Sequence, residues 1–203
     1  MARTEIKIGG FGGQGVILAG TIIGKAASLF DAKHATMIQS FGPEARGSTC
    51  SSQLIVADEE IMYPYLRKPN ILMAFSHDAY ATFEPEMASD GMLLIESDLV
   101  KPKPTRGSVK TYGIPATKIA EEIGKRVVTN IVMVGFFAAV SGLISADAAR
   151  SAVLDTIPKG TEELNLRAFE RTLVGIFGHL SDDRAVPLLG EELWSREIQV
   201  RLG

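Results

Sequence analysis

Short apolar runs alternate with longer helix-like segments over the first half of the chain, a pattern typical of an α/β fold. Strand-length runs occupy residues 5–8, 34–41, 49–56, 61–63, 70–75, 91–96 and 109–112. The third and fourth runs flank an acidic turn, 58–60, which predicts a hairpin. Helices are expected at 16–30 and 77–88, the second interrupted by Pro85. Because strands and helices alternate, we expect a mostly parallel, open, Rossmann-like sheet with right-handed crossovers.

From Ala116 onward the pattern predicts helices alone. Four helical segments, separated by glycine or proline, occupy Ala116–Ile123, Asn130–Val140, Ala146–Ile157 and Glu162–Leu180. The last two are expected to pair as a helical hairpin. Residues 130–137 are too apolar for an exposed helix and should be buried, in this domain or in an interface. We therefore predict a single α/β domain over residues 1–180 with a helical C-terminal part, and a tail or surface helix at 181–203.

A glycine-rich turn, residues 9–15, joins the first strand to a helix that begins at Val16. Gly10, Gly12 and Gly15 match the G-x-G-x-x-G spacing. Glycines at such positions permit positive φ and a close approach of ligand to backbone, and the helix N-terminus offers unpaired N–H groups to an anion such as phosphate. The other interpretation is that the glycines only permit a tight turn and close helix packing.

The end of the second strand weakens a dinucleotide interpretation of this turn. A nicotinamide cofactor site places Asp or Glu about 20 residues beyond the glycines, where the carboxylate binds the ribose hydroxyls. Here the end of the second strand carries Gln39 and Ser40, and neither is acidic. NAD binding is therefore the less favoured alternative.

The loop that follows the second strand, residues 41–48, contains glycine and proline and carries Arg46. With the first and second strands adjacent in a parallel sheet, this loop and Gly12–Gly15 would leave the same carboxyl edge, where α/β sheets bind ligands. A guanidinium offers a fixed fork to a phosphate or carboxylate. We therefore expect Arg46 and the glycine loop to face one anionic ligand. The alternatives are that Arg46 is a solvated surface charge, or pairs with Glu44 or a partner chain.

Composition narrows the classes of function. The 203 residues are 46% hydrophobic and 22% charged, which suits one large domain with its own core. A net charge of −3 without a basic run argues against nucleic acid as a partner.

No stretch has the roughly 18 uninterrupted apolar residues of a membrane span, and the N-terminus leads directly into a strand. We therefore expect no membrane span, no signal peptide and a cytoplasmic protein. Cys50 is the only cysteine, which excludes an internal disulfide, a cysteine-ligated zinc site and an iron–sulfur cluster held by this chain alone.

Five sequence blocks together resemble one known family, and they span roughly residues 5 to 178. The blocks, in order, are Gly9–Val16, Phe41–Gly47, Ile114–Ala116, Arg126–Gly135 and Glu163–Phe169. Their order and content are similar to the gamma subunit of the 2-oxoacid:ferredoxin oxidoreductases. That family usually has a second glycine after the arginine–glycine pair, where this chain has Ser48, so the backbone of this loop is expected to differ.

The resemblance implies a part in a larger enzyme. Members of the family decarboxylate a 2-oxoacid on thiamine diphosphate, pass electrons through iron–sulfur clusters to ferredoxin, and transfer the acyl group to coenzyme A. This chain has no Gly-Asp-Gly motif for thiamine diphosphate and magnesium, and one cysteine cannot hold a cluster. The resemblance therefore implies alpha and beta subunits, with most of the thiamine site on beta, and a ferredoxin-like delta subunit that carries the clusters.

The family also implies a substrate and a site. Stand-alone gamma chains of this length resemble those of 2-oxoglutarate enzymes, with pyruvate and branched-chain 2-oxoacids as alternatives; a purely scaffolding subunit is the other possibility. No catalytic residue or metal ligand is expected on this chain. The residues expected at the coenzyme A or substrate side of the assembled active site are Gly10, Gly12, Gly13, Gln14, Gly15 and Arg46.

Overall fold

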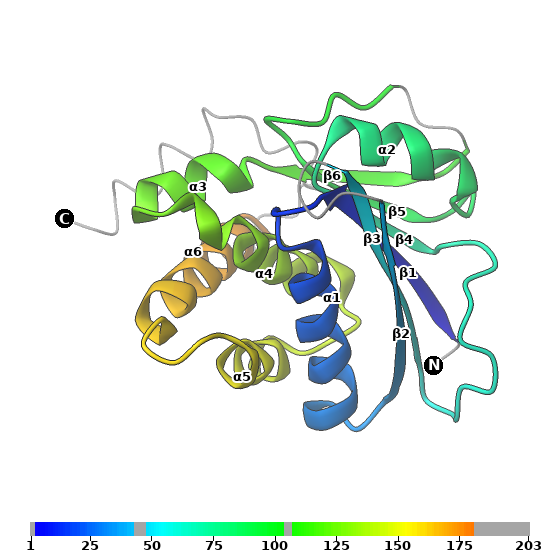
Figure 1. The fold of residues 1–203 in the computed structure, drawn as a ribbon, viewed down its shortest axis with the longest axis horizontal. Coiled ribbons are helices and arrows are strands. Elements are labelled where there is room, and N and C mark those ends of the chain that lie inside the picture. Colours follow the sequence, from blue (N-terminus) through cyan, green and yellow to red (C-terminus); the bar gives the residue numbers. More distant parts are fainter. Residues whose placement is uncertain (1–2, 43–47, 104–106, 181–203) are drawn as a thin grey trace.

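The computed structural model describes residues 3–42, 48–103 and 107–180 of the chain. The tail predicted at 181–203 lies outside these residues. Within them, six strands form one sheet in the order β2-β3-β1-β4-β5-β6 (Figure 1). The strands are β1 Thr4–Phe11, β2 His34–Phe41, β3 Thr49–Ala57, β4 Ile71–Ala74, β5 Met92–Glu96 and β6 Lys110–Ile114.

The sheet is mixed, with three parallel and two antiparallel strand pairs. Strands β1, β4, β5 and β6 are parallel, whereas β3 runs antiparallel to both β1 and β2. This confirms the mostly parallel α/β sheet expected from the sequence. Every predicted strand is present except 61–63.

The expected adjacency of the first and second strands is wrong, because β3 lies between them. The register pairs Phe11 of β1 with Thr49, and Phe41 of β2 with Cys50, the first two residues of β3. An antiparallel strand between β1 and β2 leaves those two strands parallel to each other, so both still end at one edge of the sheet. The expectation that β1 and β2 end at the same edge of the sheet is therefore confirmed, although the two strands are not adjacent.

The predicted strand at 61–63 is also wrong, because the chain between β3 and β4 forms an irregular loop. The Glu5 carboxylate accepts hydrogen bonds from the backbone N–H groups of Arg67 (2.6 Å) and Lys68 (2.9 Å). Met62 is 85% exposed. A side chain thus satisfies backbone donors of this loop, and the loop buries no apolar face that would favour a strand.

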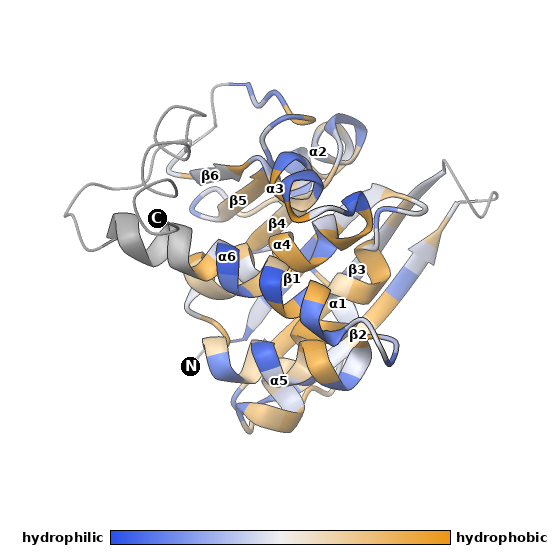
Figure 2. Cartoon of the chain, turned by 90° about the vertical axis from the view of Figure 1, so that its left-hand side faces the viewer, coloured by the Kyte–Doolittle hydropathy of each residue, from blue (hydrophilic) through white to orange (hydrophobic). Residues whose placement is uncertain are grey.

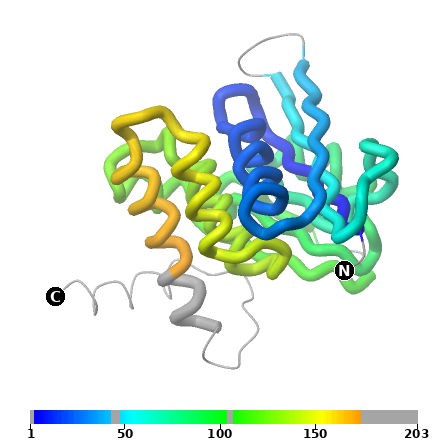
Figure 3. Tube along the Cα trace, turned by 90° about the horizontal axis from the view of Figure 1, so that it is seen from below, coloured from blue at the N-terminus to red at the C-terminus, as the bar shows by residue number. Residues whose placement is uncertain are grey.

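The helices follow the predicted segments closely. They are α1 Val16–Lys25, α2 His77–Phe83, α3 Ala116–Ile123, α4 Thr129–Ser141, α5 Ala146–Thr156 and α6 Glu162–Leu180. The first predicted helix ends in a π-helical turn, Ala26–Phe30, and the second gives way to a 3₁₀ turn, Glu84–Glu86, around its proline. The expected contact between α5 and α6 is present, although α6 packs mainly against α4. Figure 3 shows these C-terminal helices beside α1.

Two hydrophobic cores lie on opposite faces of the sheet. Successive side chains of β4 alternate between them, with Ile71 and Met73 in the larger core and Leu72 and Ala74 in the smaller. The larger core includes buried side chains of α1, α4 and α5, and the smaller one is covered by α2. Figure 2 shows hydrophobic residues gathered on α1 and α4 and on the strands beneath them.

The burial of α4 predicted from its composition is confirmed. Residues 130–138 are all buried, and Phe136 and Phe137 are fully so. The neighbouring elements that cover this helix are α1, α3, α5 and α6. The N-terminal end of α4 lies next to the start of α1, where Asn130 packs against Gly15.

Candidate functional site

The glycine loop follows β1 at the carboxyl edge of the sheet and leads into α1. Two of its glycines require positive φ: Gly13 at 98° and Gly15 at 76°, where Gly15 is also the N-cap of α1. Gly10 instead ends the buried part of β1, where a Cβ would lie within 2.9 Å of atoms of Gln14, Val16 and Phe75. The loop therefore uses glycine both for its turn and for close packing.

Gln14 holds the loop in place. Its side-chain Oε1 accepts a hydrogen bond from the Phe11 backbone N–H (2.7 Å), and its Nε2 donates to the Phe75 carbonyl beyond the end of β4 (3.1 Å). The backbone N–H of Gln14 also donates to the Phe11 carbonyl (3.1 Å). The side chain thus joins the ends of two parallel strands, and its part in ligand binding stays a prediction.

The first turn of α1 presents unpaired donors. The first intrahelical hydrogen bond runs from the Ala19 N–H to the Gly15 carbonyl (2.9 Å). The N–H groups of Val16, Ile17 and Leu18 make no hydrogen bond to any other residue that the structure describes. No side chain caps this end and no acidic residue lies in the first turn. These donors and the helix dipole favour an anion here.

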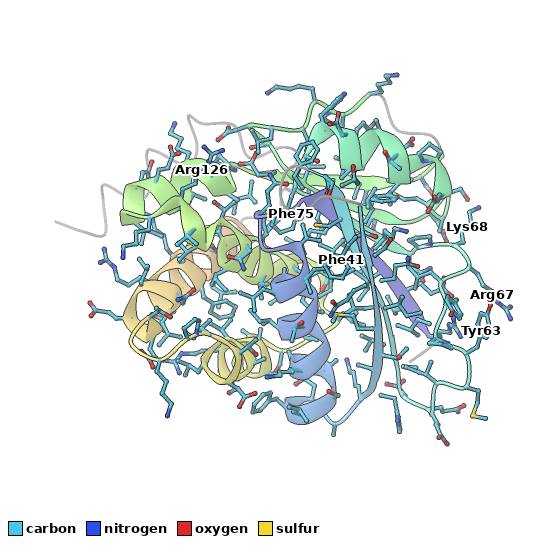
Figure 4. The ribbon with its side chains drawn as sticks, viewed as in Figure 1. Phe41, Tyr63, Arg67, Lys68, Phe75 and Arg126 are labelled. Atoms are coloured by element: carbon cyan, nitrogen blue, oxygen red, sulfur yellow. The ribbon has the colours of Figure 1, made fainter. Side chains whose placement is uncertain are left out.

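The end of β2 and the residues that begin β3 also border the site. The Gly12 N–H donates to the Ser48 carbonyl (2.9 Å), and the Gly42 N–H donates to the Thr49 carbonyl (3.0 Å). A cavity of about 600 Å³ is lined by the glycine loop, the first turn of α1, the end of β2 and the start of β3. Its lining residues are Gly12, Gly13, Gly15, Val16–Leu18, Phe41, Gly42, Ser48 and Cys50. Figure 4 shows Phe41 and Phe75 near the N-terminal end of α1.

The predicted site residues separate into three groups. Gly12, Gly13 and Gly15 line the cavity, whereas Gly10 and Gln14 support the loop from within. Arg46 lies among residues 43–47, outside the part of the chain that the structure describes.

Sequence reasoning missed Asn130, which lies next to the glycine loop. Its amide nitrogen is 2.6 Å from the position that a Cβ on Gly15 would occupy, and the residue is only 4% exposed. The only signal in the sequence is one polar residue at the start of an otherwise apolar run.

Glu96, at the carboxyl end of β5, is a second polar residue that sequence reasoning missed. Its side chain is fully buried, and its carboxylate accepts hydrogen bonds from the N–H groups of Leu99 (2.7 Å) and Thr117 (2.9 Å), the latter in the first turn of α3. Burial raises the pKa of this carboxyl. The two backbone hydrogen bonds lower the pKa, but burial is the larger effect, so the pKa is raised overall. The Glu96 side chain anchors the start of α3 to the carboxyl edge of the sheet.

The raised pKa of Glu96 gives a pH-dependent prediction. Since the native state keeps this proton to a higher pH than the unfolded state, raising the pH favours unfolding. The free energy of unfolding of wild type minus that of Glu96→Gln should be greatest below the ordinary pKa of 4.5, and should fall as the pH rises through the raised value. Urea titrations between pH 4 and pH 8 measure this difference, with the exposed Glu59→Gln as control. A difference that rises with pH would contradict the prediction.

The described residues contain neither a candidate metal centre nor a candidate membrane span. No group of three or more His, Cys, Asp or Glu residues among them is placed to bind a metal ion. In the same part of the chain, no helix combines the length and the apolar character needed to cross a membrane.

Two solved structures share this fold. The gamma subunit of a keto/oxoacid ferredoxin oxidoreductase from Geobacter sulfurreducens has a TM-score of 0.78 and 34% sequence identity, covering 88% of this chain and 98% of that one. The 2-oxoglutarate:ferredoxin oxidoreductase from Magnetococcus marinus, whose structure holds 2-oxoglutarate, coenzyme A and succinyl-CoA, also has a TM-score of 0.78. That likeness covers 93% of this chain and 32% of the other at 18% identity, and it shows the fold alone.

The sequence matches agree with the structural ones. The 2-oxoglutarate synthase subunit KorC of Methanocaldococcus jannaschii is 45% identical over 171 residues, which cover 83% of this chain and 91% of KorC. Residues 5–173 match the family described as pyruvate ferredoxin/flavodoxin oxidoreductase, and this span contains both the glycine loop and the β2–β3 turn. The chain belongs to the pyruvate ferredoxin/flavodoxin oxidoreductase family.

Proposed function

We propose that this chain is the gamma subunit of a 2-oxoglutarate:ferredoxin oxidoreductase, which converts the 2-oxoacid and coenzyme A to an acyl-CoA and passes the electrons to ferredoxin. The observation that carries the choice of substrate is the 45% identity with a 2-oxoglutarate synthase subunit over nearly that subunit's whole length. Pyruvate and branched-chain 2-oxoacids are the substrates to be tested against it.

In this proposal the redox and decarboxylation chemistry belongs to other chains. Thiamine diphosphate and magnesium would be held mainly by a beta subunit working with alpha, and the iron–sulfur clusters by a delta subunit that reduces ferredoxin. This chain would supply one domain, residues 1–180, to a cytoplasmic complex.

The site proposed for this chain is an anion site for coenzyme A or the 2-oxoacid, formed by the glycine loop and Arg46. The unpaired N–H groups of Val16–Leu18 and the cavity of about 600 Å³ support it. Arg46 lies in the sequence between Gly42 and Ser48, which both line that cavity. A guanidinium that reached the same ligand would complement the N–H donors of α1.

Arg46→Lys in the reconstituted complex tests this site. Lysine keeps the charge and loses the fork, so we expect kcat/KM for 2-oxoglutarate or coenzyme A to fall by the equivalent of roughly 1–3 kcal/mol. The measurements are the two Michaelis constants and the turnover, repeated with pyruvate and a branched-chain 2-oxoacid. Arg67→Lys is the matched control, because Arg67 lies in the loop before β4, far from Phe41 (Figure 4).

The outcomes separate a ligand role of Arg46 from a structural one, and they also test the substrate. Normal assembly with wild-type constants would contradict a ligand role. Failure of the complex to assemble would make the arginine structural. Faster turnover of pyruvate than of 2-oxoglutarate by the wild-type complex would overturn the substrate assignment.

A further inference from the structure

Strand β2 forms one outer edge of the sheet, and no strand of the described residues pairs with its open side. Figure 2 shows β2 at the outside of the molecule, with no described element beyond it. Its ladder with β3 runs without interruption from His34 to Phe41 and contains no bulge. An open strand of this kind offers a row of N–H and C=O groups to another chain.

The two edges of the sheet differ in how they are protected. Charged residues, proline, bulges and short length keep an edge strand from pairing with other chains. Strand β6, at the far edge, has five residues, begins with Lys110 and is followed at once by Pro115. Strand β2 has eight residues, and none of them is Lys, Arg, Asp, Glu or Pro. It is therefore the edge that lacks these protections.

The ladder with β3 determines which backbone groups of β2 point outward. Gly42, the residue after β2, donates its N–H to the Thr49 carbonyl (3.0 Å), which makes these two residues a hydrogen-bonded pair. Such pairs recur at every second residue of an antiparallel ladder. The even-numbered residues of β2 therefore bond to β3. The odd-numbered residues direct their N–H and C=O groups to the open edge, and they are Ala35, Met37, Gln39 and Phe41.

These outward groups match a second copy of the same strand. Two β2 strands that run antiparallel about a two-fold axis at Ile38 place Ala35 opposite Phe41, and Met37 opposite Gln39. Each outward N–H and C=O group then faces its counterpart in the other copy, as in a hydrogen-bonded pair. A shift of one residue would turn the side chains of one copy to the wrong face of the sheet, so this register is specific.

The side chains on the two faces fit the same register. On the α1 face Ala35 packs against the larger core, whereas Phe41 is 65% exposed and can cover Ala35 of the second copy. On the other face Ile38 is only partly buried, belongs to neither described core, and would meet its own copy at the axis. Because β2 has no Lys, Arg, Asp or Glu, the pairing brings no like charges together.

We propose that two copies of this chain associate through their β2 strands and form one continuous sheet across the two-fold axis. The antiparallel arrangement brings the Phe41 end of one strand to the start of the other. There Leu29 and Phe30, in the turn before β2, are 62% and 43% exposed. Exposed apolar side chains at both ends of the strand would thereby be covered. This pairing is independent of the 2-oxoacid that the enzyme uses.

Sedimentation equilibrium of the full-length chain, from about 1 µM to about 100 µM, tests the pairing. We expect the wild type to dimerise, and Gln39→Pro to raise the Kd of the dimer about tenfold or more. Proline has no N–H, and the Gln39 N–H faces the open edge, so this variant loses a bond to the second copy and keeps the ladder with β3. Urea unfolding checks that the fold remains.

A charge swap at Ile38 tests the two-fold axis itself. In the proposed dimer residue 38 meets its own copy, so Ile38→Lys and Ile38→Glu should each weaken self-association about tenfold or more, because like charges face each other. An equimolar mixture of the two variants should dimerise again, since each pair then holds opposite charges. Val127→Lys is the matched control: this residue is 76% exposed and lies before α4, and the variant should dimerise as the wild type does.

The results decide which chain occupies the edge. A wild-type chain that stays monomeric over the whole concentration range, or a dimer that all three β2 variants leave unchanged, would overturn the inference. Monomeric Ile38 variants that do not recover on mixing would overturn the axis at Ile38. A monomeric chain that binds a purified partner subunit, with binding lost in Gln39→Pro, would assign the edge to that subunit instead of a second copy.

Discussion

Purified alone, this chain will catalyse no 2-oxoglutarate-dependent dye reduction and will show no iron–sulfur absorption band. Its only cysteine, Cys50, is 7% exposed, and burial raises the pKa of the thiol, which keeps it protonated and unsuited to ligate iron or attack a carbonyl. The chain also has no Gly-Asp-Gly motif for thiamine diphosphate. Activity should appear only when the partner subunits are added.

The assay compares the isolated chain with the reconstituted complex under anaerobic conditions, using 2-oxoglutarate, coenzyme A and a viologen dye. Cys50→Ala is the control, since a complex that contains it should keep its iron content and its turnover. Dye reduction or a visible absorption band from the isolated chain would contradict the prediction, and iron lost from the Cys50→Ala complex would contradict its reason.

Replacing Gly15 with alanine should lower the free energy of unfolding by roughly 2–5 kcal/mol. The backbone at φ 76° costs a non-glycine residue roughly 1–2 kcal/mol. The new Cβ would also press on Asn130 at 2.6–2.8 Å, and overpacking of a buried contact costs roughly 1–3 kcal/mol more. Urea unfolding measures the sum.

Gly13→Ala separates the two costs. Gly13 has φ 98°, and no atom lies within 4 Å of the position that its Cβ would take, so this variant carries only the backbone cost. In the double variant Gly15→Ala/Asn130→Ala part of the lost stability should return, because the smaller side chain relieves the contact. Equal destabilisation by Gly13→Ala and Gly15→Ala, without recovery in the double variant, would show that Asn130 does not press on the loop.

Most elements of the fold could be predicted from local patterns. The helices Ala116–Ile123 and Glu162–Leu180 and the strand His34–Phe41 have the predicted bounds, because apolar periodicity reports which face of an element is buried. The prediction of a strand at 61–63 was wrong, because the conformation of that loop depends on a contact with a distant residue, which local apolar periodicity does not report. The Glu5 carboxylate, 62 residues away from Arg67 in the chain, takes up the backbone donors of that loop.

The candidate site could be predicted in part. The glycine spacing located the α1 N-terminus and the positive-φ turn, and both Gly12 and Gly15 line the cavity. Gln14 was predicted beside a ligand, yet its side chain spans 61 residues of sequence to reach the Phe75 carbonyl. A hydrogen bond between residues so far apart in the chain cannot be predicted from local spacing in the sequence.

By itself, the sequence determined the alternation of strands and helices, the glycine loop that connects β1 to α1, the burial of α4 and the blocks that identify the family. Each of these features depends on residues only a few positions apart. Only the tertiary structure decided that β3 lies between β1 and β2, and that Asn130 meets Gly15. Strand order and the contact between two helix ends are fixed by packing among segments far apart in the chain, so local sequence patterns do not reveal them.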